Sequence, residues 1–78
     1  MHYVYLLRCS DGSIYTGCTN DIDDRLKRHQ AGYIEYTSRR LPVKLVFYAA
    51  IADQSKAYAF EKYLKSGSGA AFRNKHLI

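Results

Sequence analysis

Four side chains in the first thirty residues are of types that could act on a phosphate group. Tyr5, Tyr15 and Arg25 follow one another at intervals of ten residues, and His29 comes one helical turn after Arg25. The planar guanidinium of arginine binds phosphate oxygens and neutralises the charge that builds in a transition state. Histidine transfers protons near neutral pH, whereas a tyrosine, with a reference pKa of about 10, is a base only if a cation favours its phenolate. Taken singly, each residue is more often structural, in strand packing, on a solvated helix face or at a helix C-terminus.

Glu61 is the one acidic residue in residues 54–78 and lies beside an expected apolar helix stripe. The cations of this segment are Lys56, Lys62, Lys65, Arg73 and Lys75. Hydrolysis of a phosphodiester requires a cation or a metal on the phosphate, and Mg²⁺ accepts a site with one protein carboxylate. The alternative is an ion pair between Glu61 and Lys65, four residues apart on a helix. From these residues alone, the ion pair is the simpler interpretation.

A tight hairpin must place the two tyrosines. Residues 3–9 and residues 13–19 are rich in aromatic and β-branched side chains, and the segment between them ends in Gly12. This pattern is typical of two antiparallel strands joined by a turn. A three-residue loop with Gly12 in the left-handed conformation puts Tyr5 and Tyr15 on the same face of the sheet, whereas a two-residue loop puts them on opposite faces.

The rest of the chain predicts helices and a third strand. Residues 21–31 begin with acids and end with bases, which suits a helix dipole, and Asn20 or Asp21 is the expected cap. We expect a loop at 32–42, a strand at 43–50, a helix at 56–65 capped by Ser55, and a short helix at 70–76 after a Ser-Gly break. The order β-β-α-β-α-α predicts one small α/β (α+β) domain over residues 1–78, with a three-stranded, mostly antiparallel sheet flanked by helices.

The charge distribution indicates a polyanionic partner. The net charge is +5, yet residues 1–24 hold one arginine and four aspartates, so the rest of the chain carries the whole positive excess. Nucleic acid is a candidate partner for such a chain, although a solvated basic surface is the simpler alternative. The candidate contacts to a nucleic-acid backbone are Arg39, Arg40, Lys44 and Lys75.

The chain shows no signal for a membrane or a disulfide. Its longest apolar run, residues 45–52, is far shorter than a membrane-spanning helix, and we recognise no signal peptide. Cys9 and Cys18 lack the spacing of a zinc or redox site. We therefore expect two free thiols in a reducing cytoplasm and no membrane partner.

These residues resemble the motifs of the GIY-YIG endonuclease family, in particular its small stand-alone, UPF0213-like members. Tyr3-Val4-Tyr5 stands in the place of the GIY motif, and Tyr15-Thr16-Gly17 stands in the place of the YIG motif. The family's functional residues fall on Arg25, on His29, on Glu61 as the metal ligand and on Asn74. Tyr3 replaces a glycine of the first motif, and Cys18 replaces a lysine that follows the second motif in repair-type members.

The resemblance implies a divalent-metal-dependent DNA endonuclease, active in DNA repair or processing, with Mg²⁺ or Mn²⁺ held by Glu61. We expect Tyr5 as the base and Tyr15 as the group that orients the water or the phosphate. Single-stranded, duplex and branched DNA stay open as substrates, RNA stays open as a partner, and the sequence carries no signal for the oligomeric state. The alternative function is a nucleic-acid-binding module that keeps the fold without cutting.

This chemistry requires the site residues to converge. Tyr5 and Tyr15 must share one sheet face and reach the same pocket as Arg25 and Glu61. We therefore expect the third strand to pair with the hairpin and to deliver the helix of Glu61 beside the helix of Arg25.

Overall fold

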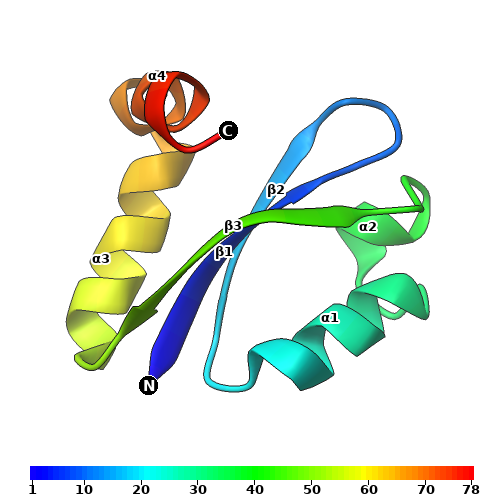
Figure 1. Ribbon diagram of the computed structural model, residues 1–78, viewed down its shortest axis with the longest axis horizontal. Helices are drawn as coiled ribbons and strands as arrows, with labels where there is room; N and C mark the ends of the chain where they lie inside the picture. Colours follow the sequence, from blue (N-terminus) through cyan, green and yellow to red (C-terminus); the bar gives the residue numbers. More distant parts are fainter.

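Three strands form one antiparallel sheet in the order β2-β1-β3. A computed structural model describes residues 1–78. β1 (His2–Arg8) lies in the centre, between β2 (Ile14–Thr19) and β3 (Lys44–Ile51) (Figure 1). The expected fold class, with a three-stranded antiparallel sheet and flanking helices, is confirmed.

The hairpin has the three-residue loop. Gly12 has a φ of +86°, which is the left-handed conformation that glycine adopts without strain. The register pairs Tyr5 with Gly17, and the rings of Tyr5 and Tyr15 lie on one face with their centroids 6.1 Å apart. The expectation of a shared face is therefore confirmed.

Four helices follow the hairpin along the chain. They are α1 (Ile22–Gln30), α2 (Glu35–Ser38), α3 (Gln54–Lys65) and α4 (Gly67–His76). The side chain of Asp21 caps α1 by accepting a hydrogen bond from the Asp24 amide. None of the helices is long and apolar enough to cross a membrane.

Three expectations about the helices were wrong, each for a local reason. The segment expected to be a loop, 32–42, contains the short helix α2. Asp53, not Ser55, caps α3, because its carboxylate accepts from the Lys56 amide at 2.9 Å and so lets the helix begin at Gln54. The Ser-Gly segment interrupts the helix for only one residue, because Ser66 accepts from the Gly69 amide and starts α4 at Gly67.

Each face of β1 faces a different core. Val4 and Leu6 pack with Ala57 and Leu64 of α3, whose side of the sheet also receives the C-terminal residues. On the opposite face, Tyr5 and Leu7 pack with Cys9 and Val43, and Ile22 and Leu26 of α1 pack against them. This alternation follows from the two-residue period of a strand.

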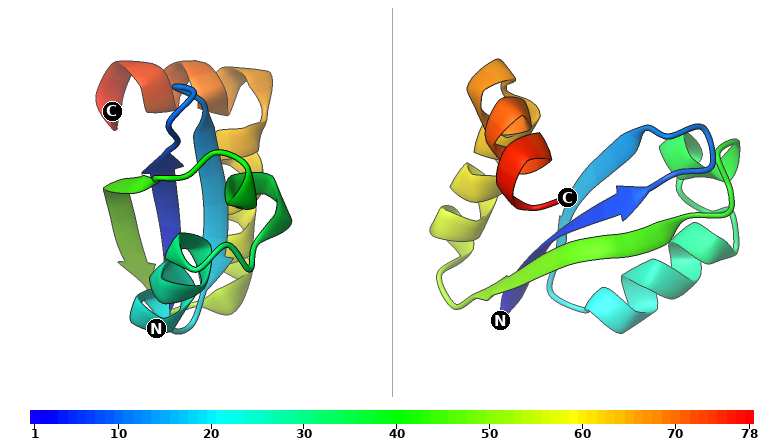
Figure 2. Two further views of the ribbon diagram at one scale, coloured as in Figure 1. Left: turned by 90° about the vertical axis from the view of Figure 1, so that its right-hand side faces the viewer. Right: turned by 45° about the horizontal axis from the view of Figure 1, so that its top comes forward.

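The helices α1 and α3 therefore lie on opposite faces of the sheet, as the views in Figure 2 show. The expectation that α3 would lie beside α1 was wrong. β3 pairs with β1 on the side away from β2, and α3 then packs on the face that α1 leaves open. α3 crosses β1 and reaches β2, so the two helices approach the exposed edge of β2 from opposite sides.

Both cysteines are free thiols, as expected. Cys9 is buried, and Cys18 lies opposite Val4 on β2.

Candidate active site

Tyr5 is a buried residue whose hydroxyl binds His29. The hydroxyl lies 2.8 Å from Nε2 of His29, and both side chains have no exposed surface. Burial, followed by the nearby Tyr15, raises the pKa of Tyr5, and Arg25 opposes this shift. A buried hydroxyl that is already bound, in a residue whose phenolate is disfavoured, is poorly suited to take a proton from a water at the surface. The expected role of Tyr5 as the base is therefore not supported.

Gly17 makes room for this tyrosine. A Cβ atom at position 17 would overlap the ring and the hydroxyl of Tyr5. The missing side chain lets the phenol lie across β2 toward α1, where His29 is located. The glycine of the second motif is thus explained by packing.

Tyr15 reaches a cavity at the edge of β2. This cavity has a volume of about 350 Å³ and will be called the Tyr15 cavity; it is lined by Ile14, Tyr15, Thr16, Tyr36, Lys65 and Arg73. The ring of Tyr15 packs against His29 at 4.9 Å and against Tyr36 at 5.6 Å between centroids. Of the two motif tyrosines, only Tyr15 lines a cavity that also contains cations.

Arg25 reaches a second cavity on the same edge. This Arg25 cavity has a volume of about 200 Å³ and is lined by His2, Cys18, Thr19, Asn20, Arg25, Gln54 and Tyr58. It therefore contains residues from α1 and from α3, which lie on opposite faces of the sheet. Residues of the two helices come together around this cavity, at the edge of the sheet that β2 forms.

Glu61 lies between the two cavities on α3. It follows Tyr58 of the Arg25 cavity by three residues and precedes Lys65 of the Tyr15 cavity by four, so these three side chains share one helix face. Burial raises the pKa of the Cys18 thiol, Glu61 raises it further, and Arg25 lowers it. Arg25 and Glu61 thus both lie near Cys18 of β2. Tyr15 and Arg25 nevertheless line separate cavities, and Glu61 and the buried Tyr5 line neither, so the expectation of one shared pocket was wrong.

The donor set at Glu61 limits which metal it can hold. The Glu61 side chain is 22% exposed and pairs with Lys65 at 3.2 Å. No group of three histidine, cysteine, aspartate or glutamate side chains could hold a metal ion. A single carboxylate fits a hydrated Mg²⁺ that takes its other ligands from water and phosphate, and it does not fit a structural zinc site.

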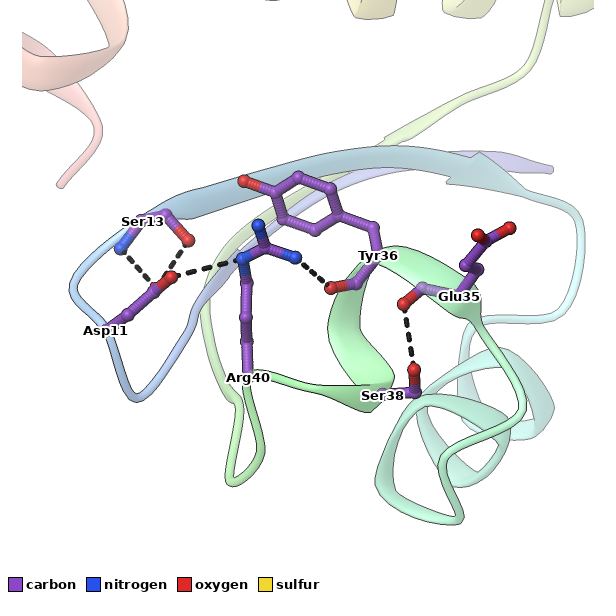
Figure 3. A network of polar contacts seen from close by, with 6 residues as sticks. All are labelled: Asp11, Ser13, Glu35, Tyr36, Ser38 and Arg40. Carbon is purple, nitrogen blue, oxygen red and sulfur yellow. Dashed lines mark hydrogen bonds and ion pairs between the residues drawn. The ribbon is translucent and has the colours of Figure 1, made fainter.

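The guanidinium of Arg40 is already bound to other residues of the protein. Figure 3 shows its guanidinium between the hairpin tip and α2, where it donates to Asp11 at 3.1 Å and to the Tyr36 carbonyl at 2.6 Å. It also lies over the ring of Tyr36 at 4.1 Å. Arg40 therefore holds Tyr36, and through it the Tyr15 ring, and the expected contact of Arg40 with nucleic acid is not supported.

The other expected contacts lie outside the two cavities. Lys44 is on β3, the edge of the sheet farthest from β2. Arg39 is exposed and lines a separate hollow with Asp11 and Glu35. Lys75 and Asn74 are exposed on α4 and line neither cavity, and Asn74 accepts a hydrogen bond from Arg73 at 3.1 Å.

Lys65, Tyr58, Arg73 and Tyr36 line the cavities and were not among the expected site residues. Lys65 and Tyr58 could have been found, because they lie one turn on either side of Glu61 on a helix. Arg73 and Tyr36 gave no such signal, because their place depends on how α4 and α2 pack.

Known proteins resemble this chain over most of its length. The model of the GIY-YIG catalytic domain family matches residues 1–75. The UPF0213 protein CPE1444 of Clostridium perfringens is 44% identical over 66 residues, which cover 83% of this chain and 71% of the relative. A UPF0213 protein of Haloquadratum walsbyi is also 44% identical over 66 residues, covering 83% of this chain and 74% of that protein.

A solved structure shares the fold. The solution NMR structure of the UPF0213 protein BH0048 from Bacillus halodurans is 39% identical to this chain, with a TM-score of 0.61. The match covers 95% of this chain and 82% of that protein.

Proposed function

Because this chain belongs to the GIY-YIG family of nucleases, we propose that it is a divalent-metal-dependent endonuclease that hydrolyses phosphodiester bonds in DNA. One observation carries the proposal. Tyr15, Arg25 and Glu61 come from three different elements, and the fold brings them to one edge of the sheet. This edge is the catalytic surface of the proposal.

In the proposed mechanism, Tyr15 takes the proton of the attacking water. Its side chain reaches the Tyr15 cavity, whereas Tyr5 is buried. Lys65 and Arg73 line the same cavity, so a phosphate bound by these cations would lie next to the Tyr15 hydroxyl together with the attacking water. Tyr5 and His29 support the Tyr15 ring from below, since both pack against it.

Arg25 binds the phosphate in this mechanism. Its side chain is partly exposed in the Arg25 cavity and lies near the Tyr5 hydroxyl. Because the guanidinium presents several donors in one plane, it can hold two phosphate oxygens as negative charge develops on them.

Glu61 would hold the metal ion, Mg²⁺ or Mn²⁺. When bound, the ion would polarise the phosphate and stabilise the leaving oxygen. Lys65 pairs with Glu61 in the absence of the ion, and such a partly exposed pair contributes little stability, so a cation can displace it.

The DNA backbone follows the edge of β2 in this proposal. Lys65 and Arg73, rather than Arg40, Lys44 and Lys75, are the proposed contacts next to Tyr15. The positive excess of the chain supports a nucleic acid as the partner.

A cleavage assay tests the proposal. Single-stranded, duplex and branched DNA and an RNA strand are incubated with the protein, with Mg²⁺, with Mn²⁺ or with a chelator. We expect cleavage of a DNA substrate that requires the metal and that is abolished in Glu61→Gln. Glu35→Gln is the matched control, because Glu35 is an exposed carboxylate that lines neither cavity.

The same assay tests the alternative function. A chain that binds these substrates and cuts none of them, with either metal, is a nucleic-acid-binding module with the nuclease fold. Cleavage by Glu61→Gln at the rate of the unchanged protein contradicts the role of Glu61.

A further inference from the structure

A chain of hydrogen bonds runs beneath the catalytic surface, from β1 through α1 to α2. The Tyr5 hydroxyl lies 2.8 Å from Nε2 of His29, and Nδ1 of His29 lies 2.8 Å from Oγ1 of Thr37. Oγ1 of Thr37 donates to the carbonyl of Ile34 at 3.3 Å. Tyr5, His29 and Thr37 have no exposed surface, so water does not compete for these bonds.

Counting protons along this chain gives the direction of each bond. The hydroxyl of Thr37 has a single proton, and this proton is directed to the Ile34 carbonyl. The same oxygen must then accept from His29, so the proton of the imidazole is on Nδ1. A neutral imidazole with its proton on Nδ1 has an acceptor at Nε2, and the Tyr5 hydroxyl must be the donor there.

The surroundings of His29 favour this neutral form. Tyr5 of β1, Tyr15 of β2 and Thr37 of α2 face the ring, and Arg25 lies on its own helix. Arg25 is the only charged group among them, and it is a cation. Burial, followed by Arg25, lowers the pKa of His29.

We propose that Thr37 is a positioning residue that holds His29 in the Nδ1–H tautomer and so directs the proton of the Tyr5 hydroxyl onto Nε2. The Tyr5 oxygen then keeps its lone pairs for Arg25, whose side chain acts on the same hydroxyl. In the opposite tautomer, Nε2–H would donate to the Tyr5 oxygen, and the phenol proton would turn toward Arg25 or Tyr15. A donor would then face the guanidinium, which would move Arg25 away from the position in which it meets the phosphate.

The tautomer can be read directly by NMR of protein labelled with ¹⁵N in histidine. The pattern of two-bond couplings to the ring protons distinguishes Nδ1–H, Nε2–H and the charged ring. His2 and His76, which take no part in these buried hydrogen bonds, are internal controls. We expect the Nδ1–H pattern for His29 at pH 7 in the unchanged protein and in Thr37→Ser. We expect the Nε2–H pattern, or a mixture, in Thr37→Val, which removes the hydroxyl and keeps the shape.

Two results of this measurement overturn the proposal. One is an Nε2–H or charged His29 at pH 7 in the unchanged protein, and the other is an unaltered Nδ1–H pattern in Thr37→Val. If Thr37→Val does not fold, the unchanged protein and Thr37→Ser still decide the question.

A kinetic measurement separates positioning from simple structural support. This part rests on the proposed function, whereas the tautomer measurement does not. We expect Thr37→Val to lower kcat about tenfold or more, as for other residues that fix a histidine tautomer, with KM unchanged and with activity restored in Thr37→Ser. Equal losses in both variants, or a change in KM alone, contradict a positioning role. If the unchanged protein cuts nothing, the proposed function fails while the NMR result for Thr37 stands.

Discussion

Tyr5 lies across Gly17 of the neighbouring strand so closely that a Cβ atom at position 17 would overlap its ring. The glycine therefore sets the path of the phenol to His29, 2.8 Å from its hydroxyl. The positions of Tyr5, His29 and Tyr15 all depend on that path, because Tyr15 packs against both Tyr5 and His29.

Gly17→Ala is expected to lower the free energy of unfolding by about 1–3 kcal/mol, because the added methyl group must displace a packed side chain. Gly67→Ala is the control, since a Cβ there meets nothing within 4 Å. Urea denaturation of both variants checks this. A Gly17→Ala protein as stable as the control would show that Tyr5 can move aside at no cost.

Tyr15→Phe is expected to lower the cleavage rate by about a hundredfold or more without unfolding the protein, because it removes the proposed base and keeps the ring packing. Tyr5→Phe is expected to lower the free energy of unfolding by about 1–3 kcal/mol, because Nε2 of His29 loses its buried donor. Single-turnover cleavage and thermal denaturation check the pair. Full activity in Tyr15→Phe together with an inactive, folded Tyr5→Phe would return the role of base to Tyr5.

Arg25→Ala is expected to lower the cleavage rate by orders of magnitude while binding weakens modestly. Loss of one phosphate contact changes the slope of log affinity against log salt by only about 1. Arg25→Lys is the control, because it keeps the charge and loses the planar fork. Binding titrations at several salt concentrations, with cleavage measured in parallel, check this. Equal losses of binding and rate would reduce Arg25 to a docking residue.

Arg73→Gln and Lys75→Gln remove the same charge from the same helix. Arg73 lines the Tyr15 cavity and Lys75 does not. We expect Arg73→Gln to reduce the salt slope of DNA binding by about 1 and Lys75→Gln to leave it nearly unchanged. Fluorescence anisotropy at several salt concentrations measures both slopes. A larger effect of Lys75→Gln would place the DNA on another face of α4.

The protein is expected to lose stability as the pH falls below about 6.5, the reference pKa of histidine. Burial first, and Arg25 second, lower the pKa of His29 in the folded state, so the unfolded chain binds the proton more readily. Stability then falls with pH from about 6.5 down to the folded pKa and no further on this account. Urea midpoints between pH 5 and pH 8 measure the effect. His29→Gln should flatten the dependence and His76→Gln should keep it, and a His29→Gln protein with an unaltered pH dependence would contradict the assignment.

Local features of the sequence determined the hairpin and the helix α1. The loop that ends in Gly12 placed Tyr5 and Tyr15 on one face, because a turn of given length and conformation sets the strand register. The acids before α1 and the bases at its end marked that helix, because capping and the dipole act within a single turn. The motif residues Arg25 and Glu61 could be named for the same reason, since type and spacing were sufficient to identify them.

Only the tertiary structure decided which of these side chains meet, and which are exposed. β3 pairs with the far side of β1, so α3 lies on the face opposite α1, and Arg25 and Glu61 approach each other around the edge of β2. Tyr5 is buried, whereas Tyr15 is partly exposed, because Gly17 has no side chain and leaves room for the Tyr5 ring beneath the Tyr15 ring. Arg40 turns to Asp11, and Arg73 rather than Lys75 faces Tyr15, because these contacts depend on segments packed together from distant parts of the chain. Contacts between distant segments are determined by how whole faces of the sheet are buried. This burial cannot be read from any short segment of the sequence.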